Sequence, residues 1–148
     1  MLHKFMNLYD RIISKLLLGS PIYFGGRRDR VSIHATAVVN NALFNAVSGD
    51  IEVREFVFFG HNVCVLTGTH DIHKRRKERQ REVPKKGRDI VIGEGAWVAS
   101  NATIIGPVII GADSVVCAGA VVVDDVPKNT VVGGVPARVI KSIEFNKY

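Results

Sequence analysis

The sequence holds little of what stabilises disulfide-rich or aromatic-rich folds. Its two cysteines, Cys64 and Cys117, form no CxxC motif among the 148 residues. This excludes a disulfide framework and favours a reducing compartment. Aromatic residues make up 7% of the chain, whereas apolar residues together make up 47%. We therefore expect a narrow core built mainly from Val, Ile and Ala.

Long apolar runs are also missing. No stretch reaches the roughly 20 residues that a membrane-spanning helix needs, and the N-terminus shows no signal-peptide pattern. These absences predict a soluble, cytoplasmic protein. The length predicts one domain that is large enough to bury its own core.

Most of the chain carries no net charge. The formal net charge is +6, and residues 73–89 hold nine Lys/Arg and three Asp/Glu. The 20 basic and 14 acidic residues of the whole chain leave 11 of each outside that segment. A nucleic-acid-binding face usually combines such charge with aromatic residues, and this segment contains none. We predict no nucleic-acid partner.

The stretch from Ile92 to Val126 repeats with a period of six. Aliphatic residues recur at Ile92, Val98, Ile104, Ile110, Val116 and Val122. Small or β-branched residues follow each by four positions, at Ala96, Ala102, Val108, Ser114, Ala120 and Val126. A helix would show a period near 3.6 and a simple strand a period of 2. The pattern predicts a solenoid of short strands joined by tight corners, with three hexads to a coil.

The first half follows this period less strictly. The expected inward residues are Ile33, Val39, Val53, Phe59 and Val65, with Ala37 and Leu43 in small slots. The phase is poor at Asn45, and two additional residues at 47–50 shift the count. Residues 31–69 thus predict about two further coils.

The remaining segments surround these coils. Residues 1–22 are expected to form an amphipathic helical cap on the open end of the solenoid; a membrane-surface helix is the alternative, because Lys4, Arg11 and Lys15 are basic. Residues 70–89 form an extruded loop without regular structure, and a loop that long is usually functional. Regular coils occupy 90–126, and 127–148 form a C-terminal turn, one irregular strand and a tail.

Several motifs carry a family resemblance. They are Ile92-Gly93-Glu94-Gly95-Ala96-Trp97-Val98, Gly119-Ala120-Val121-Val122, Val126-Pro127-Lys128-Asn129-Thr130 and Gly134-Val135-Pro136-Ala137-Arg138-Val139-Ile140. The chain resembles the hexapeptide-repeat acyltransferases, which include galactoside, maltose and surface-polysaccharide O-acetyltransferases. The resemblance implies an all-β, left-handed parallel β-helix. Only the resemblance supplies this hand, because parallel crossovers are normally right-handed.

The resemblance also implies a homotrimer with active sites between subunits. Phe56 and Phe58 fall on outward positions of the repeat, and outward aromatic residues suggest a covered surface. A protruding loop that one prism cannot bury points the same way.

His70 is the candidate catalytic residue. It stands where a coil ends and the loop begins, and imidazole titrates in the range that suits a general base. The resemblance implies that His70 deprotonates a hydroxyl or amine, which attacks acetyl-CoA directly. An ordinary loop histidine is the alternative.

The resemblance to galactoside acetyltransferases implies the donor contacts. Ser100 and Ala118 fall at positions that contact the thiol-proximal arm of CoA, and Trp97 matches a further family position. Arg138 and Lys141 fall at the basic contacts to the nucleotide, where cations suit phosphates. Acetyl-CoA is thus the expected co-substrate.

One departure from the family concerns charge. The family's Thr-Lys pair is Val123-Asp124 here, and Asp124 would repel a CoA phosphate. Another cation should replace the lysine, and the basic loop of a neighbouring subunit is one source. The loop could instead bind a phosphate of the acceptor or form a solvated face. We favour CoA, because its phosphates are certain for a CoA-dependent enzyme.

The acceptor side has fewer signals. Asn40 matches an acceptor-contacting asparagine of galactoside acetyltransferases, and the family's carboxylate falls at Ser48, with Asp50 nearby. The implied acceptor is a sugar or a polysaccharide precursor, since the large N-terminal domains of other family branches are missing.

Two further functions remain open. The first is a non-catalytic trimeric scaffold. The second is a metal enzyme similar to the γ-class carbonic anhydrases, with His70 and His73 as ligands. The histidine spacing of that class is missing, so we expect no metal.

Overall fold

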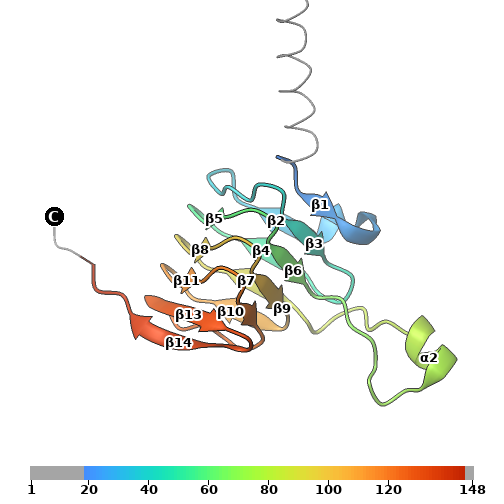
Figure 1. The fold of residues 1–148 in the computed structure, drawn as a ribbon. Coiled ribbons are helices and arrows are strands. Elements are labelled where there is room, and N and C mark those ends of the chain that lie inside the picture. Colours follow the sequence, from blue (N-terminus) through green and yellow to red (C-terminus); the bar gives the residue numbers. More distant parts are fainter. Residues whose placement is uncertain (1–18, 146–148) are drawn as a thin grey trace, which may run out of the picture.

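The computed structural model describes residues 19–145 (Figure 1). The helical cap expected at residues 1–22 therefore lies almost entirely outside the described residues. Within them, no helix is long and apolar enough to cross a membrane. Two short 3-10 turns, η1 (Phe24–Gly26) and η2 (Arg28–Arg30), connect the first strand to the coils.

Short strands stack into three sheets that form the sides of a prism (Figure 1). Sheet A contains β1 (Ile22–Tyr23), β3 (Leu43–Asn45), β6 (Cys64–Leu66), β9 (Thr103–Ile105) and β12 (Val121–Val122). Sheet B contains β2 (Val31–Ile33), β4 (Ile51–Val53), β7 (Ile90–Ile92) and β10 (Val108–Ile110). Sheet C contains β5 (Phe58–Phe59), β8 (Trp97–Val98), β11 (Val115–Val116), β13 (Thr130–Gly134) and β14 (Ala137–Ser142).

Each coil passes through sheet B, then C, then A. Ile90 of one coil pairs with Val108 of the next in parallel register, so a regular coil contains 18 residues. Three hexads fill one coil, and the expected left-handed parallel β-helix is confirmed. The chain turns at a B–C corner, a C–A corner and an A–B corner in each coil. The A–B corner lies opposite sheet C, as any corner of a triangle lies opposite one side.

The hexad pattern describes the core of the second half correctly. All six predicted aliphatic residues from Ile92 to Val122 are at most 1% exposed. The small positions are also buried, from Ala96 at 0% to Val126 at 5%. Burying one such Val or Ile side chain contributes about 1.5–3 kcal/mol, so these columns supply much of the stability of the coils.

The first coil departs from the prediction. Phe44 and Ala42 are buried, at 1% and 0% exposure, in place of the expected Asn45 and Leu43. Val38 pairs with Phe58 but Leu43 pairs with Cys64, so the C–A corner of this coil is one residue shorter. The Phe44 ring stacks on Tyr23 of β1 at 5.8 Å between centroids.

The extruded segment leaves the A–B corner between coils 2 and 3, after β6, and returns at β7. We call residues 70–89 the arm. The sequence predicted no regular structure there, but the arm contains α2 (Arg76–Arg81) (Figure 1). The guanidinium of Arg79 donates to the carbonyls of Ile72 and Lys74 at 2.8 and 2.7 Å. These side-chain bonds hold α2 against the segment that follows His70.

The C-terminal segment forms a hairpin. β13 and β14 pair antiparallel at the edge of sheet C, where the sequence predicted one irregular strand and a tail. β14 thereby covers the edge of sheet C and adds Arg138 and Lys141 to that end of the prism.

Candidate active site

His70 lies at the base of the arm, four residues after β6 and at the A–B corner. Its side chain is exposed, and no hydrogen bond or ion pair from residues 19–145 engages its imidazole ring. A general base needs a ring nitrogen that is free to accept a proton. His73 is also exposed, and its amide donates to the Asp71 carboxylate at 2.9 Å.

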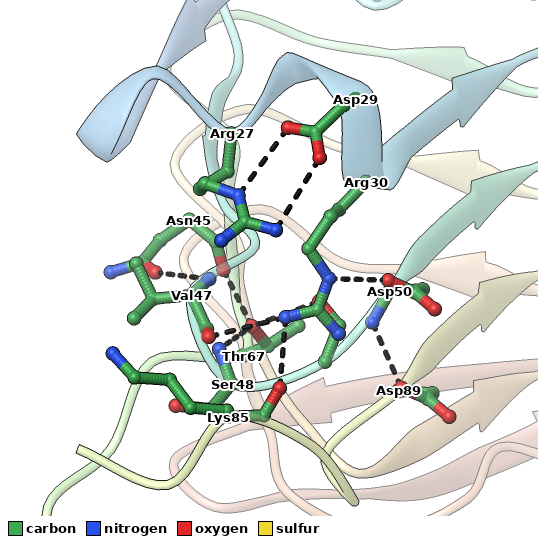
Figure 2. A network of polar contacts seen from close by, with 11 residues as sticks. Arg27, Asp29, Arg30, Asn45, Val47, Ser48, Asp50, Thr67, Lys85 and Asp89 are labelled. Atoms are coloured by element: carbon green, nitrogen blue, oxygen red, sulfur yellow. Dashed lines mark hydrogen bonds and ion pairs between the residues drawn. The ribbon is translucent and has the colours of Figure 1, made fainter.

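Two buried hydroxyl groups hold the backbone that enters His70. Ser48 and Thr67 are both 0% exposed. The Thr69 amide donates to the Ser48 hydroxyl at 3.3 Å, and the Ser48 amide donates to the Thr67 hydroxyl at 3.1 Å. The Thr67 hydroxyl in turn donates to the Asn45 carbonyl at 2.9 Å (Figure 2). The peptide before His70 is thus fixed to the coil above it.

The sequence did not reveal this role of Ser48. The resemblance placed an acceptor carboxylate there, but a fully buried side chain contacts no acceptor in this chain. The only signal was the run of small and polar residues at 45–50, which interrupts the hexads.

Arg30 fixes the other side of the arm's base. Its side chain is 15% exposed and forms an ion pair with Asp50 at 2.5 Å. Its guanidinium also donates to the carbonyls of Val47 at 3.2 Å and Lys85 at 3.0 Å (Figure 2). One cation therefore joins the connector before β2, the loop after coil 1 and the returning part of the arm. No role for Arg30 was predicted from the sequence.

Asp50, a predicted acceptor contact, shares the A–B corner with His70. Its carboxylate pairs with Arg30, and its amide donates to the Asp89 carboxylate at 2.8 Å. The side chain is still 69% exposed. Asn40, the other predicted acceptor contact, lies at the C–A corner and donates to the Phe59 carbonyl at 2.7 Å. Sheet A separates Asn40 from His70 within one chain.

A groove on sheet C brings together three of the predicted donor contacts. It measures about 690 Å³ and is lined by Trp97, Ala99, Val115, Cys117, Ala118, Val131, Lys141, Ser142, Ile143 and Glu144. We call it the sheet C groove. The Trp97 ring is 43% exposed and stacks on Phe58 at 5.7 Å between centroids. Cys117 is a lining residue that sequence analysis did not assign to any site.

Ser100 lies beside this groove, at the C–A corner. Its hydroxyl accepts a hydrogen bond from the His61 amide at 3.0 Å. A Cβ atom at Gly60 would lie 2.4 Å from the same hydroxyl, so Gly60 is needed for this close contact. Ser100 therefore joins neighbouring coils, and its hydroxyl proton remains available to a ligand.

Arg138 is separate from the sheet C groove. It pairs with Asp124 at 3.2 Å, with side chains that are 66% and 73% exposed. The two residues line a smaller hollow of about 190 Å³. Asp124, which stands where the family has a lysine, is thus partly neutralised by Arg138. The family resemblance assigns Arg138 to CoA.

No metal centre is evident in residues 19–145. This part of the chain contains no group of three or more His, Cys, Asp or Glu side chains arranged to hold a metal ion. His34 instead lies beside Glu55, at 3.6 Å, and beside the Thr36 hydroxyl at 2.9 Å.

Comparison with known proteins places these features in a family. The family model described as bacterial transferase hexapeptide (six repeats) matches residues 89–124. Galactoside O-acetyltransferase of Lactococcus lactis is 30% identical over 143 residues, covering 95% of this chain and 67% of that protein. The Escherichia coli galactoside O-acetyltransferase is 34% identical over 128 residues, covering 83% of this chain and 59% of that protein.

Solved structures agree with these relatives. A hexapeptide-repeat acetyltransferase of Vibrio cholerae, complexed with acetyl-CoA, superposes with a TM-score of 0.69 at 32% identity, covering 84% of this chain and 66% of that one. A galactoside acetyltransferase complexed with CoA superposes at 0.55 and 27% identity, covering 85% and 61%. The chain thus spans 59% to 67% of the length of these four proteins. By its repeats, its fold and these relatives, the chain belongs to the family of hexapeptide-repeat acetyltransferases.

Proposed function

We propose that the protein transfers the acetyl group of acetyl-CoA to a sugar hydroxyl, with His70 as the general base. The observation that carries this proposal is the sheet C groove, where Trp97, Ala118 and Lys141 meet. The family resemblance assigns these three residues to the donor from the sequence alone, without reference to any cavity. The free imidazole of His70 at a rigid base of the arm supports the same reaction.

The reaction needs one proton acceptor and one thioester. His70 removes the proton of the acceptor hydroxyl as its oxygen attacks the acetyl carbonyl carbon. The tetrahedral intermediate collapses, the carbon–sulfur bond breaks, and the CoA thiolate leaves. The imidazolium of His70 then returns its proton to the thiolate, which leaves free CoA and the acetyl ester. No covalent enzyme intermediate forms.

The sheet C groove suits the donor. Its walls are apolar at Trp97, Val115 and Val131, and the peptide groups near Ala118 offer partners for the amides of pantetheine. Lys141 supplies a cation for the phosphates. The Ser100 hydroxyl beside the groove donates a hydrogen bond to the pantetheine of CoA, near its sulfur.

We propose a homotrimer, because one chain does not hold a complete site. His70 is at the A–B corner, and sheet C is the side of the prism opposite that corner. A second subunit is needed to place a donor groove beside His70. Phe56 and Phe58 are 62% and 44% exposed, and a partner would cover them. Light scattering should return three times the chain mass, and a stable monomer in active samples would overturn this arrangement.

We place the reaction in the cytoplasm, where acetyl-CoA is made and used, and we propose polysaccharide precursors as acceptors.

The test combines donor binding with turnover. Calorimetry should detect acetyl-CoA binding, and a thiol reagent should detect CoA release when sugars are added. His70→Ala should lower kcat by about 10²–10⁴-fold, the usual contribution of a general base, and leave the Kd for acetyl-CoA unchanged.

His73→Ala is the matched control, because His73 is equally exposed and lies three residues away. It should retain most of the activity. A larger loss from His73→Ala than from His70→Ala would refute the assignment of the base, and absence of acetyl-CoA binding would refute the proposed function.

A further inference from the structure

The nine basic side chains of the arm divide into two groups. Three of them serve the structure of the arm. Lys74 pairs with Glu82, and this hydrogen bond raises the pKa of Lys74. Arg79 donates to two carbonyls of the arm, and Arg88 donates to the Thr67 carbonyl at 3.0 Å.

The other six cations make no such contact. They are exposed, and within residues 19–145 their side chains form no ion pair or hydrogen bond: Arg75, Arg76, Lys77, Arg81, Lys85 and Lys86. The arm also holds four acidic residues, Asp71, Glu78, Glu82 and Asp89, so its nine basic residues leave it a net charge of +5. A concentration of unpaired charge of one sign attracts ligands of the opposite sign.

The arm carries this charge close to the general base. The arm begins directly after His70, and Ser48, Thr67 and Arg30 tie both of its ends to the coils. A group bound on the arm is therefore held at a fixed place relative to His70. In Figure 1, α2 projects on the right, whereas the strands of sheet C lie on the left. Within one chain the free cations adjoin the general base and not the donor groove.

A hollow at the root of the arm is lined by two carboxylates and two of the free cations. It measures about 400 Å³ and is lined by Asp71, Arg81, Glu82, Val83, Pro84 and Lys85. Two of the free cations, Arg81 and Lys85, share it, and Asp71 is the neighbour of His70 in the sequence. Lys77 stands four residues before Arg81 and so lies on the same side of α2.

We infer that the arm binds the acceptor, and that this acceptor is anionic: a saccharide that carries phosphate or carboxylate groups. This inference rests on the proposed function and names its substrate class. It takes up the second role considered for the basic loop, a ligand for a charged acceptor, in place of the phosphates of CoA. The free cations extend over α2 and the returning segment, which suits a ligand with several negative groups better than one isolated phosphate.

The experiment compares charged and neutral saccharides. Binding of UDP-glucose, glucose 1-phosphate, oligogalacturonate, glucose and maltose is measured by calorimetry at low ionic strength. The phosphate and carboxylate probes distinguish the two sources of charge. The test variant carries Lys77→Gln, Arg81→Gln and Lys85→Gln, and the control variant carries Arg27→Gln, Arg54→Gln and Lys128→Gln. Both lose three positive charges, but only the first loses them from the arm.

We expect at least one anionic probe to bind the wild-type protein more tightly than the neutral sugars. The test variant should lose about tenfold in that affinity, because three unit charges at about 8 Å each favour an anion by two- to threefold in water. The loss should shrink in 0.5 M salt, since exposed charges are screened. The control variant and the Kd for acetyl-CoA should not change.

Other outcomes overturn the inference. They are equal binding of charged and neutral probes, an equal loss in the control variant, or a loss of acetyl-CoA affinity in the test variant. Tight binding of anionic lipid vesicles with no binding of the anionic saccharides would also overturn it. In each case acetyl-CoA binding and CoA release by the wild-type protein would still support the proposed function, so the two failures are distinguishable.

Discussion

Ser48→Ala tests how the fold positions the general base. The Ser48 side chain is 0% exposed, and its hydroxyl accepts the amide hydrogen of Thr69, the residue before His70. Alanine fits the same space but leaves this half-buried amide without its acceptor. Such a loss costs about 1–3 kcal/mol, and the 3.3 Å distance of the bond favours the lower end of that range. We expect the free energy of unfolding to fall by about 1 kcal/mol.

The effect on turnover should be larger than the effect on stability suggests. Once the peptide before His70 is released, the imidazole no longer has one position, and a misplacement of about 1 Å can cost about 10²-fold in rate. Since Ser48→Ala leaves the bond between the Ser48 amide and Thr67 intact, we expect a smaller loss, about tenfold in kcat. The KM for acetyl-CoA should stay the same, because Ser48 is fully buried and lines no part of the sheet C groove.

Ser114→Ala provides the control. Ser114 is also 0% exposed, and its hydroxyl donates to the Gly111 carbonyl at 2.7 Å, at the B–C corner of coil 4. Urea unfolding should show a similar loss of stability for both variants, whereas CoA release should slow only in Ser48→Ala. Equal kcat values for the two variants would refute the role of Ser48 in positioning His70.

Two further predictions concern the donor end and the corners. Asp124→Asn should lower the KM for acetyl-CoA several-fold, because it frees Arg138 and removes a negative charge. Stability should change little, since an exposed ion pair contributes at most about 1 kcal/mol. Steady-state kinetics with an unchanged KM would contradict this prediction. Gly119→Asn should raise stability by about 0.4–1 kcal/mol, because Gly119 has φ +68° and Asn62 and Asn101 adopt φ of +57° and +61° at this corner. Gly119→Ala should instead lower it by about 1 kcal/mol, and thermal unfolding that ranks Ala above Asn would contradict this reasoning.

The sequence determined the regular coils, their inward columns and the position of the arm. In a solenoid each coil contacts mainly its neighbours, so a local period of six repeats as a column of buried residues in the tertiary structure. Ile92, Ile104 and Ile110 could therefore be assigned to the core from spacing alone, and all are 0% exposed. The place of His70 followed in the same way, because it stands where the period stops.

Only the tertiary structure decided what happens where the period fails. Phe44 replaces Asn45 in the core because one corner is a residue shorter, and no pattern along the chain counts residues in a corner. Arg30 reaches Val47 and Lys85, which are 17 and 55 residues away, and Ser48 reaches Thr69 across a whole coil. Arg138 pairs with Asp124, and the donor groove lies opposite His70. These contacts join segments that are far apart in the sequence. Which residues meet depends on how side chains pack in three dimensions, and the hexad period does not encode that.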